Sequence, residues 1–478
     1  MTSAAVRSGA APPVPSASMP SAGAFLDAVL ARYAGHPRMV VVTMPAPVVP
    51  LPTVFGLLDD PSAFLWEPPE GPGYAAFGEA WAVEPAGAER GTRARALAES
   101  VGARMEAVYH PAVPPARPRW FGGLAFAPGA ASASPWSGFG DGRFVLPRWC
   151  YGRDGERAWL SFATDGAGLD ADGRARASAE LRRWIAQLEV RVGRWPEPAP
   201  APRASLHVEH LDEDAWGVQV NAIREVIDAG RLDKVVAARR SMIDTGEDIA
   251  PALVLTRLGH DYPGCTRFAV RRGDATFVGA TPEWLVRRSG RRVRSEAMAG
   301  SVAHGASATL LASDKDRREH DLVVRTLVER LEPHCASLDR APEPHVRELP
   351  NVVHLHTPVV GELRRPTHVL ELVDTLHPTP AVGGVPVEAA VDWIATHEPH
   401  ARGWYSAPIG WFDADGDGEF VVALRSGLVR GHRAWAYAGA GIVRGSEPHA
   451  EYAETDLKLR PLLEALGQAR PRVGEGEP

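Results

Sequence analysis

Short apolar runs separated by glycine and proline clusters fill most of the first 200 residues of the chain. Several of them have the length and the β-branched or aromatic content of strands: MVVVTM, AFLWEP, YAAFGEAWAVE, WFGGLAF, FVLPRWCYG and RAWLSFA. Helices are expected at 24–33, 93–108 and 174–192. Most connections between the strands are too short for helical crossovers, so neighbouring strands are expected to pair antiparallel. The pattern therefore predicts an α+β fold with a largely antiparallel sheet.

The second half of the chain alternates helices with strands. Apolar stripes at helical spacing predict a helix at 211–230, with Asp214 as its N-cap, and another at 314–331, with Ser313 as its N-cap. Between them, 266–300 predicts a meander with tight turns. Near the end, GEFVVALRSGLVRGHRAWAYAGAGIV predicts a hairpin that leads into one more helix.

Two stretches lack the pattern of a folded element. Residues 1–22 are rich in Ala, Pro and Ser and are expected to form a disordered tail. The proline-rich segment 195–205 predicts a linker or a long surface connection. It separates a subregion at 23–200 from a second one at 206–470.

Composition excludes several classes of protein. The chain has 478 residues, 45% of them apolar, and a formal net charge of -7. Mild acidity without a basic cluster argues against a nucleic-acid partner. Three cysteines are too few for a disulfide framework or a CxxC zinc site, so a reducing cytoplasm is expected. The most apolar run, 39–58, contains four prolines, so no membrane-spanning helix and no membrane partner are expected.

Paired carboxylates are the first candidate for chemistry. Glu451, Glu454 and Lys458 share one face of the last predicted helix, and Asp316 and Glu319 have the same i, i+3 spacing on another helix. Such a face is either a solvated surface or half of an oxygen-rich metal site. Two helices of this kind can converge on a hard cation, for which Mg²⁺ is the best candidate. The acidic loop DADGDGE is expected to be a β-turn and not a calcium loop.

Two further residues are ambiguous from the pattern alone. Lys234 lies in an apolar strand, where it either faces solvent or points into a cleft as a general base. Glu283, in a turn beside Trp284, either faces solvent or is a carboxyl group kept protonated by apolar surroundings.

Arg425 interrupts an apolar strand and is suited to bind a carboxylate. The AMAGS and GAGI segments are expected to be turns, with or without an anion-binding role.

Many separate motifs occur together over 211–466, in the order DKVVAARR, GATPEWL, AMAGS, SDKDRREHDLV, VVHLHTP, LHPTPAVGG, RGWYSAPIGWFDADGDGEF, ALRSG and GAGIVRGSEPHAEYAET. In these motifs the chain resembles the chorismate-utilising enzymes, which comprise isochorismate, salicylate, anthranilate and aminodeoxychorismate synthases. The resemblance implies one complex α/β domain over 23–470, with large, mostly antiparallel sheets and flanking helices that enclose the active site.

The resemblance also implies roles for individual residues. Lys234 is the expected general base and Glu283 the general acid. Glu319 and Glu454 are expected to hold Mg²⁺, with Asp316 and Glu451 close by or acting through water. The substrate pocket is expected to be lined by Gly300, Ser301, His354, Ala381, Tyr405, Arg425, Gly441 and Lys458.

The nucleophile separates the members of this family. Aminating members resemble one another in carrying Gln where this chain has Lys234, and they use ammonia from a glutaminase. A lysine here implies that water attacks C2 of chorismate while the C4 hydroxyl leaves, and that no glutaminase subunit is needed. Salicylate synthases share the lysine and then eliminate pyruvate, but Ala381 and Val382 resemble the isochorismate-forming type.

The alternatives are therefore a salicylate synthase, an aminating enzyme, or a protein that binds chorismate without turnover. Isochorismate feeds siderophores, menaquinone and salicylate-derived products, and the sequence does not select one of these pathways.

Overall fold

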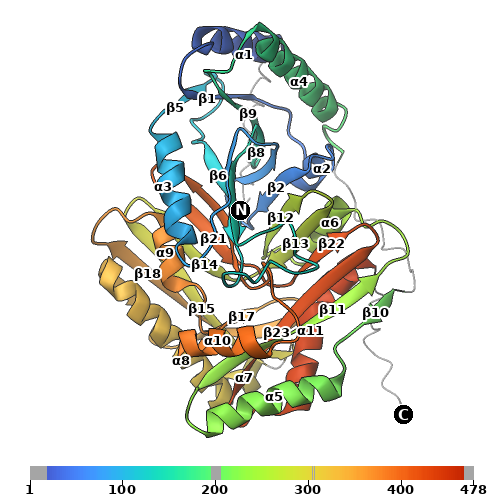
Figure 1. Ribbon diagram of the computed structural model, residues 1–478, viewed down its shortest axis with the longest axis vertical. Helices are drawn as coiled ribbons and strands as arrows, with labels where there is room; N and C mark the ends of the chain where they lie inside the picture. Colours follow the sequence, from blue (N-terminus) through green and yellow to red (C-terminus); the bar gives the residue numbers. More distant parts are fainter. Residues whose placement is uncertain (1–18, 195–205, 304, 306, 468–478) are drawn as a thin grey trace, which may run out of the picture.

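Residues from both halves of the chain build two large sheets with helices around them (Figure 1). The computed structural model describes residues 19–194, 206–303, 305 and 307–467. The predicted linker, 195–205, and the first part of the predicted tail, 1–18, lie outside the described residues. The domain boundaries expected from the sequence therefore stay predictions.

The larger sheet has 13 strands within the described residues, in the order β10-β11-β23-β22-β13-β12-β2-β3-β8-β9-β1-β5, with β19 paired to β11. Apart from the parallel pair β1 and β5, its ladders are antiparallel. The contact between β12 and β2 joins the two halves of the chain. Its strands are β1 (Met39–Pro45), β2 (Ser62–Glu67), β3 (Gly73–Phe77), β5 (Met105–Tyr109), β8 (Trp149–Asp154), β9 (Arg157–Asp165), β10 (His207–Glu209), β11 (Lys234–Asp244), β12 (Thr266–Arg272), β13 (Ala275–Thr281), β19 (Gly384–Val385), β22 (Ser426–Arg430) and β23 (Arg433–Val443).

The second sheet has 10 strands in the described part of the chain, in the order β16-β18-β15-β14-β21-β20-β6-β7-β4, with β17 paired to β18. Here too, strands of the first half (β4, β6 and β7) extend a sheet made by the second half. Its strands are β4 (Trp81–Val83), β6 (Arg119–Leu124), β7 (Gly142–Leu146), β14 (Trp284–Ser289), β15 (Arg292–Ala303), β16 (Cys335–Arg340), β17 (His345–Glu348), β18 (Val352–Leu363), β20 (Pro408–Asp413) and β21 (Gly418–Val422).

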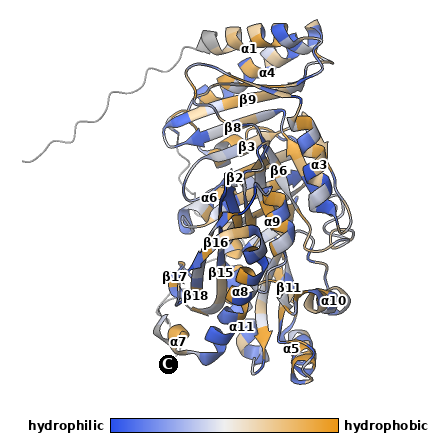
Figure 2. Cartoon of the chain, turned by 90° about the vertical axis from the view of Figure 1, so that its left-hand side faces the viewer, coloured by the Kyte–Doolittle hydropathy of each residue, from blue (hydrophilic) through white to orange (hydrophobic). Residues whose placement is uncertain are grey.

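Helices cover the outer faces and both ends of these sheets. Figure 2 shows α1 and α4 across one end of the molecule, with α5, α10 and α11 near the other. The α-helices are α1 (Met19–Tyr33), α2 (Leu51–Phe55), α3 (Arg90–Gly102), α4 (Ala171–Glu189), α5 (Glu213–Asp228), α6 (Pro251–Asp261), α7 (Ser307–Ala312), α8 (Asp314–Leu331), α9 (Val369–Leu376), α10 (Val387–His397) and α11 (Pro448–Leu466).

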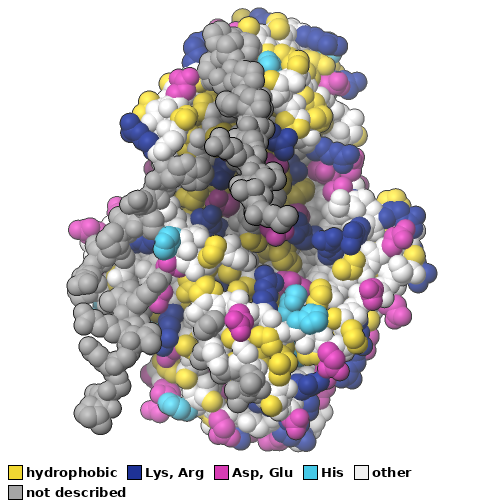
Figure 3. All heavy atoms as spheres, turned by 180° about the vertical axis from the view of Figure 1, so that it is seen from behind, with side chains coloured by type: hydrophobic (Ala, Val, Ile, Leu, Met, Phe, Trp, Pro, Cys, Tyr) yellow, Lys and Arg dark blue, Asp and Glu magenta, His cyan; other side chains and the backbone are white. Residues whose placement is uncertain are grey.

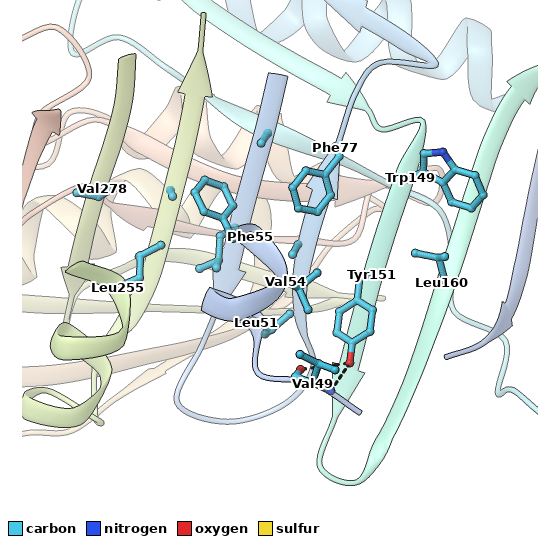
Figure 4. Close-up of a cluster of buried hydrophobic side chains, with 14 of the residues drawn as sticks. Val49, Leu51, Val54, Phe55, Phe77, Trp149, Tyr151, Leu160, Leu255 and Val278 are labelled. Atoms are coloured by element: carbon cyan, nitrogen blue, oxygen red, sulfur yellow. Dashed lines mark hydrogen bonds between the residues drawn. The ribbon is translucent and has the colours of Figure 1, made fainter. Parts of the chain in front are cut away.

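One apolar core fills the space between the larger sheet and the helices α2 and α6 (Figure 4). Phe55 and Phe77 lie in it side by side, with ring centroids 6.4 Å apart. Tyr151 is fully buried, and its hydroxyl accepts a hydrogen bond from the Val49 backbone N–H at 2.8 Å. Burying each large apolar side chain contributes about 1.5–3 kcal/mol, so this core fixes the sheet on which part of the site is built.

The predicted fold class is confirmed, with corrections to single elements. The predicted helix at 93–108 ends at Gly102, because 105–109 pairs with β1 as strand β5. Helix α5 is capped by Asp212, which accepts from the Ala215 N–H at 2.7 Å, and not by Asp214. Asp212 has the extended backbone that an N-cap needs, whereas Asp214 is already helical.

Helix α1 begins at Met19, inside the stretch predicted as tail, because a proline in the first turn does not prevent a helix. The AMAGS and GAGI segments are parts of strands β15 and β23 and not turns. Both segments pair with a neighbouring strand, β23 with β11 and β15 with β18. Burial of these strands outweighs the low strand propensity of glycine and alanine.

The surface of the described residues mixes charges of both signs with apolar side chains on the face seen in Figure 3. No helix in the described part of the chain has the length and apolar character needed to cross a membrane. The acidic DADGDGE loop forms the turn between β20 and β21, where Asp413 accepts from the backbone N–H groups of Asp415 and Asp417.

Candidate active site

A cavity lies where the two sheets meet helices α8 and α11. All but three of the site residues predicted from the sequence line it; Lys234, Asp316 and Glu451 lie outside its lining. The predicted residues in the lining are Glu283, Gly300, Ser301, Glu319, His354, Ala381, Tyr405, Arg425, Gly441, Glu454 and Lys458.

Lys234 lies directly behind the cavity wall. It is the first residue of β11, pairs with Val443 and Val385 on the neighbouring strands, and is fully buried. Its Nζ donates to Oε1 of Glu319 at 2.8 Å, so the ammonium group points toward the carboxylate that lines the cavity. Lys234 therefore does not face solvent, and its role as a general base stays a prediction.

Gly441 makes room for this pair. It lies on β23, opposite Val236 of β11. A Cβ at this position would lie 2.3 Å from Oε1 of Glu319 and 2.9 Å from Cε of Lys234. Only glycine therefore lets the lysine and the glutamate meet in this arrangement.

Glu283 is a buried carboxyl group that keeps its proton at neutral pH. It lies between β13 and β14, is 4% exposed and lines the cavity. Burial raises its pKa to about 8, and the negative charge of Glu296 adds to this effect, against the opposing charges of Lys234 and Arg425. At pH 7 the group is thus a hydrogen-bond donor and a proton source.

Three of the four predicted metal carboxylates pair with a lysine. Glu319 pairs with Lys234, Glu454 accepts from Lys458 at 2.5 Å, and Glu451 accepts from Lys315 at 2.6 Å. As the side chains lie, the described residues contain no group of three or more Asp, Glu, His or Cys that could hold a metal ion. The lysine charges take the place that a cation would fill, because buried carboxylates need a positive partner.

The donor chemistry of these carboxylates nevertheless fits a hard cation. Burial raises the pKa of Glu451, and the charge of Glu454 raises it further, while Lys315 opposes both. Burial likewise raises the pKa of Asp316, and Glu319 and Glu454 add to the shift. Carboxylates on α8 and α11 therefore act on one another electrostatically, a repulsion that a bound divalent cation relieves.

Arg425 and His354 lie next to each other in the lining of the cavity. Arg425 is 8% exposed, lies in the connection between β21 and β22, and has the left-handed backbone angle φ 50°. Its guanidinium lies 3.3 Å from Nε2 of His354. Burial, Arg425 and Lys458 lower the pKa of His354 well below its usual value, so the imidazole is neutral.

The neutral imidazole has one tautomer that satisfies its neighbours. Because Arg425 can only donate, Nε2 of His354 accepts, and Nδ1 carries the proton. Nδ1 lies 3.0 Å from the Ser301 hydroxyl and 3.3 Å from the Gly300 carbonyl. Gly300, with φ 75°, lies where the register of β15 shifts against β18, and this bulge turns Ser301 toward the cavity.

Arg402, which lines the cavity, forms an ion pair with Glu398 that was not predicted from the sequence. Arg402 donates to both oxygens of Glu398, at 2.8 and 2.5 Å, and the two side chains are almost fully buried. Arg402 also donates to the carbonyls of Val236 and Val382, each at 2.7 Å. Residues 398–402 lie outside any helix, so the i, i+4 spacing of the two charges gave no local signal for the pair.

The fold and this site together define the class of the protein. The family model of chorismate binding enzymes matches residues 25–467, and the chain belongs to this family. The predicted family is thus confirmed.

Two isochorismate synthases are similar to this chain over most of their length. The isochorismate synthase MenF of Bacillus subtilis is 37% identical over 374 residues, which are 76% of this chain and 77% of the relative. A salicylate biosynthesis isochorismate synthase of Pseudomonas aeruginosa is 37% identical over 433 residues, 88% of each chain. The structure of the menaquinone-specific isochorismate synthase of Escherichia coli has a TM-score of 0.75 at 26% identity and covers 94% of this chain and 99% of its own.

Proposed function

We propose that this chain is a Mg²⁺-dependent isochorismate synthase that isomerises chorismate. The observation that carries the proposal is a buried carboxyl group, Glu283, which holds a proton at neutral pH and faces a cavity with a lysine, Lys234, behind its wall. An acid and a base on one cavity suit a displacement in which water enters and a hydroxyl leaves. The function of the relatives supports this reading.

The proposed reaction balances as one addition and one loss of water. Lys234 removes a proton from water while the water oxygen bonds to C2 of the ring. Both conjugated ring double bonds shift by one position, the C4–O bond breaks, and Glu283 gives its proton to the departing hydroxyl. The proton held by Lys234 then returns to Glu283 before the next turnover.

The other residues bind and orient the substrate. Arg425 can meet one substrate carboxylate with a bidentate pair, and the Ser301 hydroxyl can donate because Nδ1 of His354 already supplies a proton. Glu319 and Glu454 would hold Mg²⁺, with Asp316 and Glu451 close by or acting through water. When bound, Mg²⁺ supplies positive charge for the second carboxylate and for charge that develops in the transition state.

Product analysis tests the proposal. Purified chain with chorismate and Mg²⁺ should form isochorismate without glutamine or ammonia, and a chelator should stop the reaction until Mg²⁺ is restored. Salicylate with pyruvate would instead identify a salicylate synthase. A requirement for ammonia would identify an aminating enzyme, and no product at all would leave only binding.

Two variants test the assigned roles. Lys234→Ala and Glu283→Gln should each lower kcat by about 10²-fold or more, the usual contribution of a general acid or base. Arg433→Ala is a matched control, because Arg433 lies at the other end of the same β11 and β23 ladder, opposite Asp244. Normal isochorismate formation by either active-site variant would contradict the role given to that residue.

A further inference from the structure

Strand β14 leaves its neighbour β15 just beside Glu283. The two strands pair through their backbones only at the far end of β14, from Arg287 to Ser289. Toward Trp284 this pairing stops, and the register against β21 on the other side shifts between Trp284 and Val286. The end of β14 that carries Glu283 is therefore held to β15 without backbone ladder bonds.

Two side chains of β15 replace the missing ladder bonds. Oε1 of Glu296 accepts from the Trp284 backbone N–H at 2.8 Å. The Ser295 hydroxyl donates to the Leu285 carbonyl at 2.6 Å. Two successive residues of β15 thus hold two successive residues of β14, directly after Glu283.

Glu296 is itself fixed from the strands beyond β15. Arg347 of β17 donates to both of its oxygens at 3.2 Å, and Nε2 of His356 on β18 lies 2.8 Å from Oε2. The Glu296 side chain is only 11% exposed. A carboxylate with a backbone donor, a guanidinium and an imidazole around it has no freedom to turn away from Trp284.

The charge of Glu296 also acts on Glu283. Burial is the largest influence on the Glu283 carboxyl group, and Glu296 is the negative charge that adds to it. Positive charge faces Glu283 from the other elements that enclose the cavity, and the buried Tyr405 lies within electrostatic reach as well. The opposing cations are Lys234, Arg425 and Lys458.

We propose that Glu296 is a positioning residue for the general acid, because its carboxylate anchors the strand end that carries Glu283 and keeps a negative charge beside it. This inference rests on the proposed function, in which Glu283 donates the proton. Glu296 does not line the cavity, and it acts only through Glu283 and the backbone of Trp284.

The pH profile of kcat/KM tests this inference. Activity should fall on the alkaline side as Glu283, with a pKa of about 8, loses the proton that it must donate. Glu296→Gln keeps an oxygen for the Trp284 N–H and removes the charge that favours protonation of Glu283. The alkaline limb should therefore move to lower pH, by about one unit for one nearby charge.

A second variant separates the anchor from the charge. Glu296→Ala removes both, so it should show the same shift together with a lower kcat at every pH, and a smaller effect on KM. Glu419→Gln is the matched control, because Glu419 pairs with Arg287 farther along β14 and should keep the wild-type alkaline limb. If Glu296→Ala does not fold, the shift in Glu296→Gln alone decides.

The outcomes separate a failure of the role given to Glu296 from a failure of the proposed function. An alkaline limb that stays in place, or moves to higher pH, in Glu296→Gln while Glu283→Gln is inactive would overturn the role of Glu296 alone. A Glu283→Gln variant that still forms isochorismate would overturn the proposed function, whatever Glu296→Gln does.

Discussion

Two buried groups of opposite character define the chemistry at the scale of single residues. Glu283 stays neutral because its apolar setting and Glu296 outweigh three nearby cations, whereas Glu319 stays ionised. Burial alone would raise the pKa of Glu319, but Lys234 lowers it below its usual value. Two carboxyl groups on one cavity can thus take different roles, as donor and as anion.

The contact between Lys234 and Glu319 depends on the missing side chain at Gly441. Gly441→Ala should lower kcat strongly with little change in folding, because a Cβ would lie 2.3 Å from Oε1 of Glu319. Steady-state kinetics with circular dichroism checks this. Gly217→Ala on α5 is the control: its Cβ would meet only Cβ of Pro448, at 4.0 Å, so activity should be unchanged. A fully active Gly441→Ala would contradict the proposed packing.

At the scale of elements, the ion pair of Arg402 and Glu398 connects its own segment to strand β11 and to the loop after α9. Glu398 accepts from the Ala238 N–H of β11 at 3.0 Å. Arg402 donates to the carbonyl of Val236 on the same strand and to that of Val382 in the loop after α9. The strand that carries Lys234 is therefore tied to the loop that bears Ala381.

Removing one partner of this pair should be costly. Arg402→Met leaves the Glu398 carboxylate, which is 4% exposed, without its cation, so the free energy of unfolding should fall by about 3–5 kcal/mol. Urea denaturation measures this loss. Arg38→Met, which breaks a half-exposed pair with Glu106, should leave the free energy of unfolding nearly unchanged. Equal effects of the two variants would contradict the bracing role.

Elements were predictable where local signals and tertiary packing agree. Helix α8 begins and ends where its Ser313 cap and apolar stripe predict, and Ser313 does accept from the Asp316 N–H. The helix predicted over 105–109 was wrong, because this segment pairs with β1, which is far away in the sequence. The Arg402 and Glu398 pair was overlooked, since nothing local shows that an i, i+4 pair will be buried.

At the scale of the whole molecule, both sheets mix strands from the two halves of the chain, which alternating apolar patterns could not reveal. The set of residues around the cavity came from the family resemblance, and most of them do line it. The pairs Lys234–Glu319 and Lys315–Glu451 were beyond prediction, because each joins elements far apart in the sequence, whereas Glu454 and Lys458 lie one helical turn apart on α11.

The central claim is that this chain makes water the nucleophile. Its most direct test is turnover of chorismate with Mg²⁺ in isotope-labelled water, with mass spectrometry and NMR of the product. The account predicts isochorismate with one labelled oxygen, located at C2, and loss of this product in Lys234→Ala. Isochorismate without label at C2, or a labelled product formed equally well by Lys234→Ala, would contradict it.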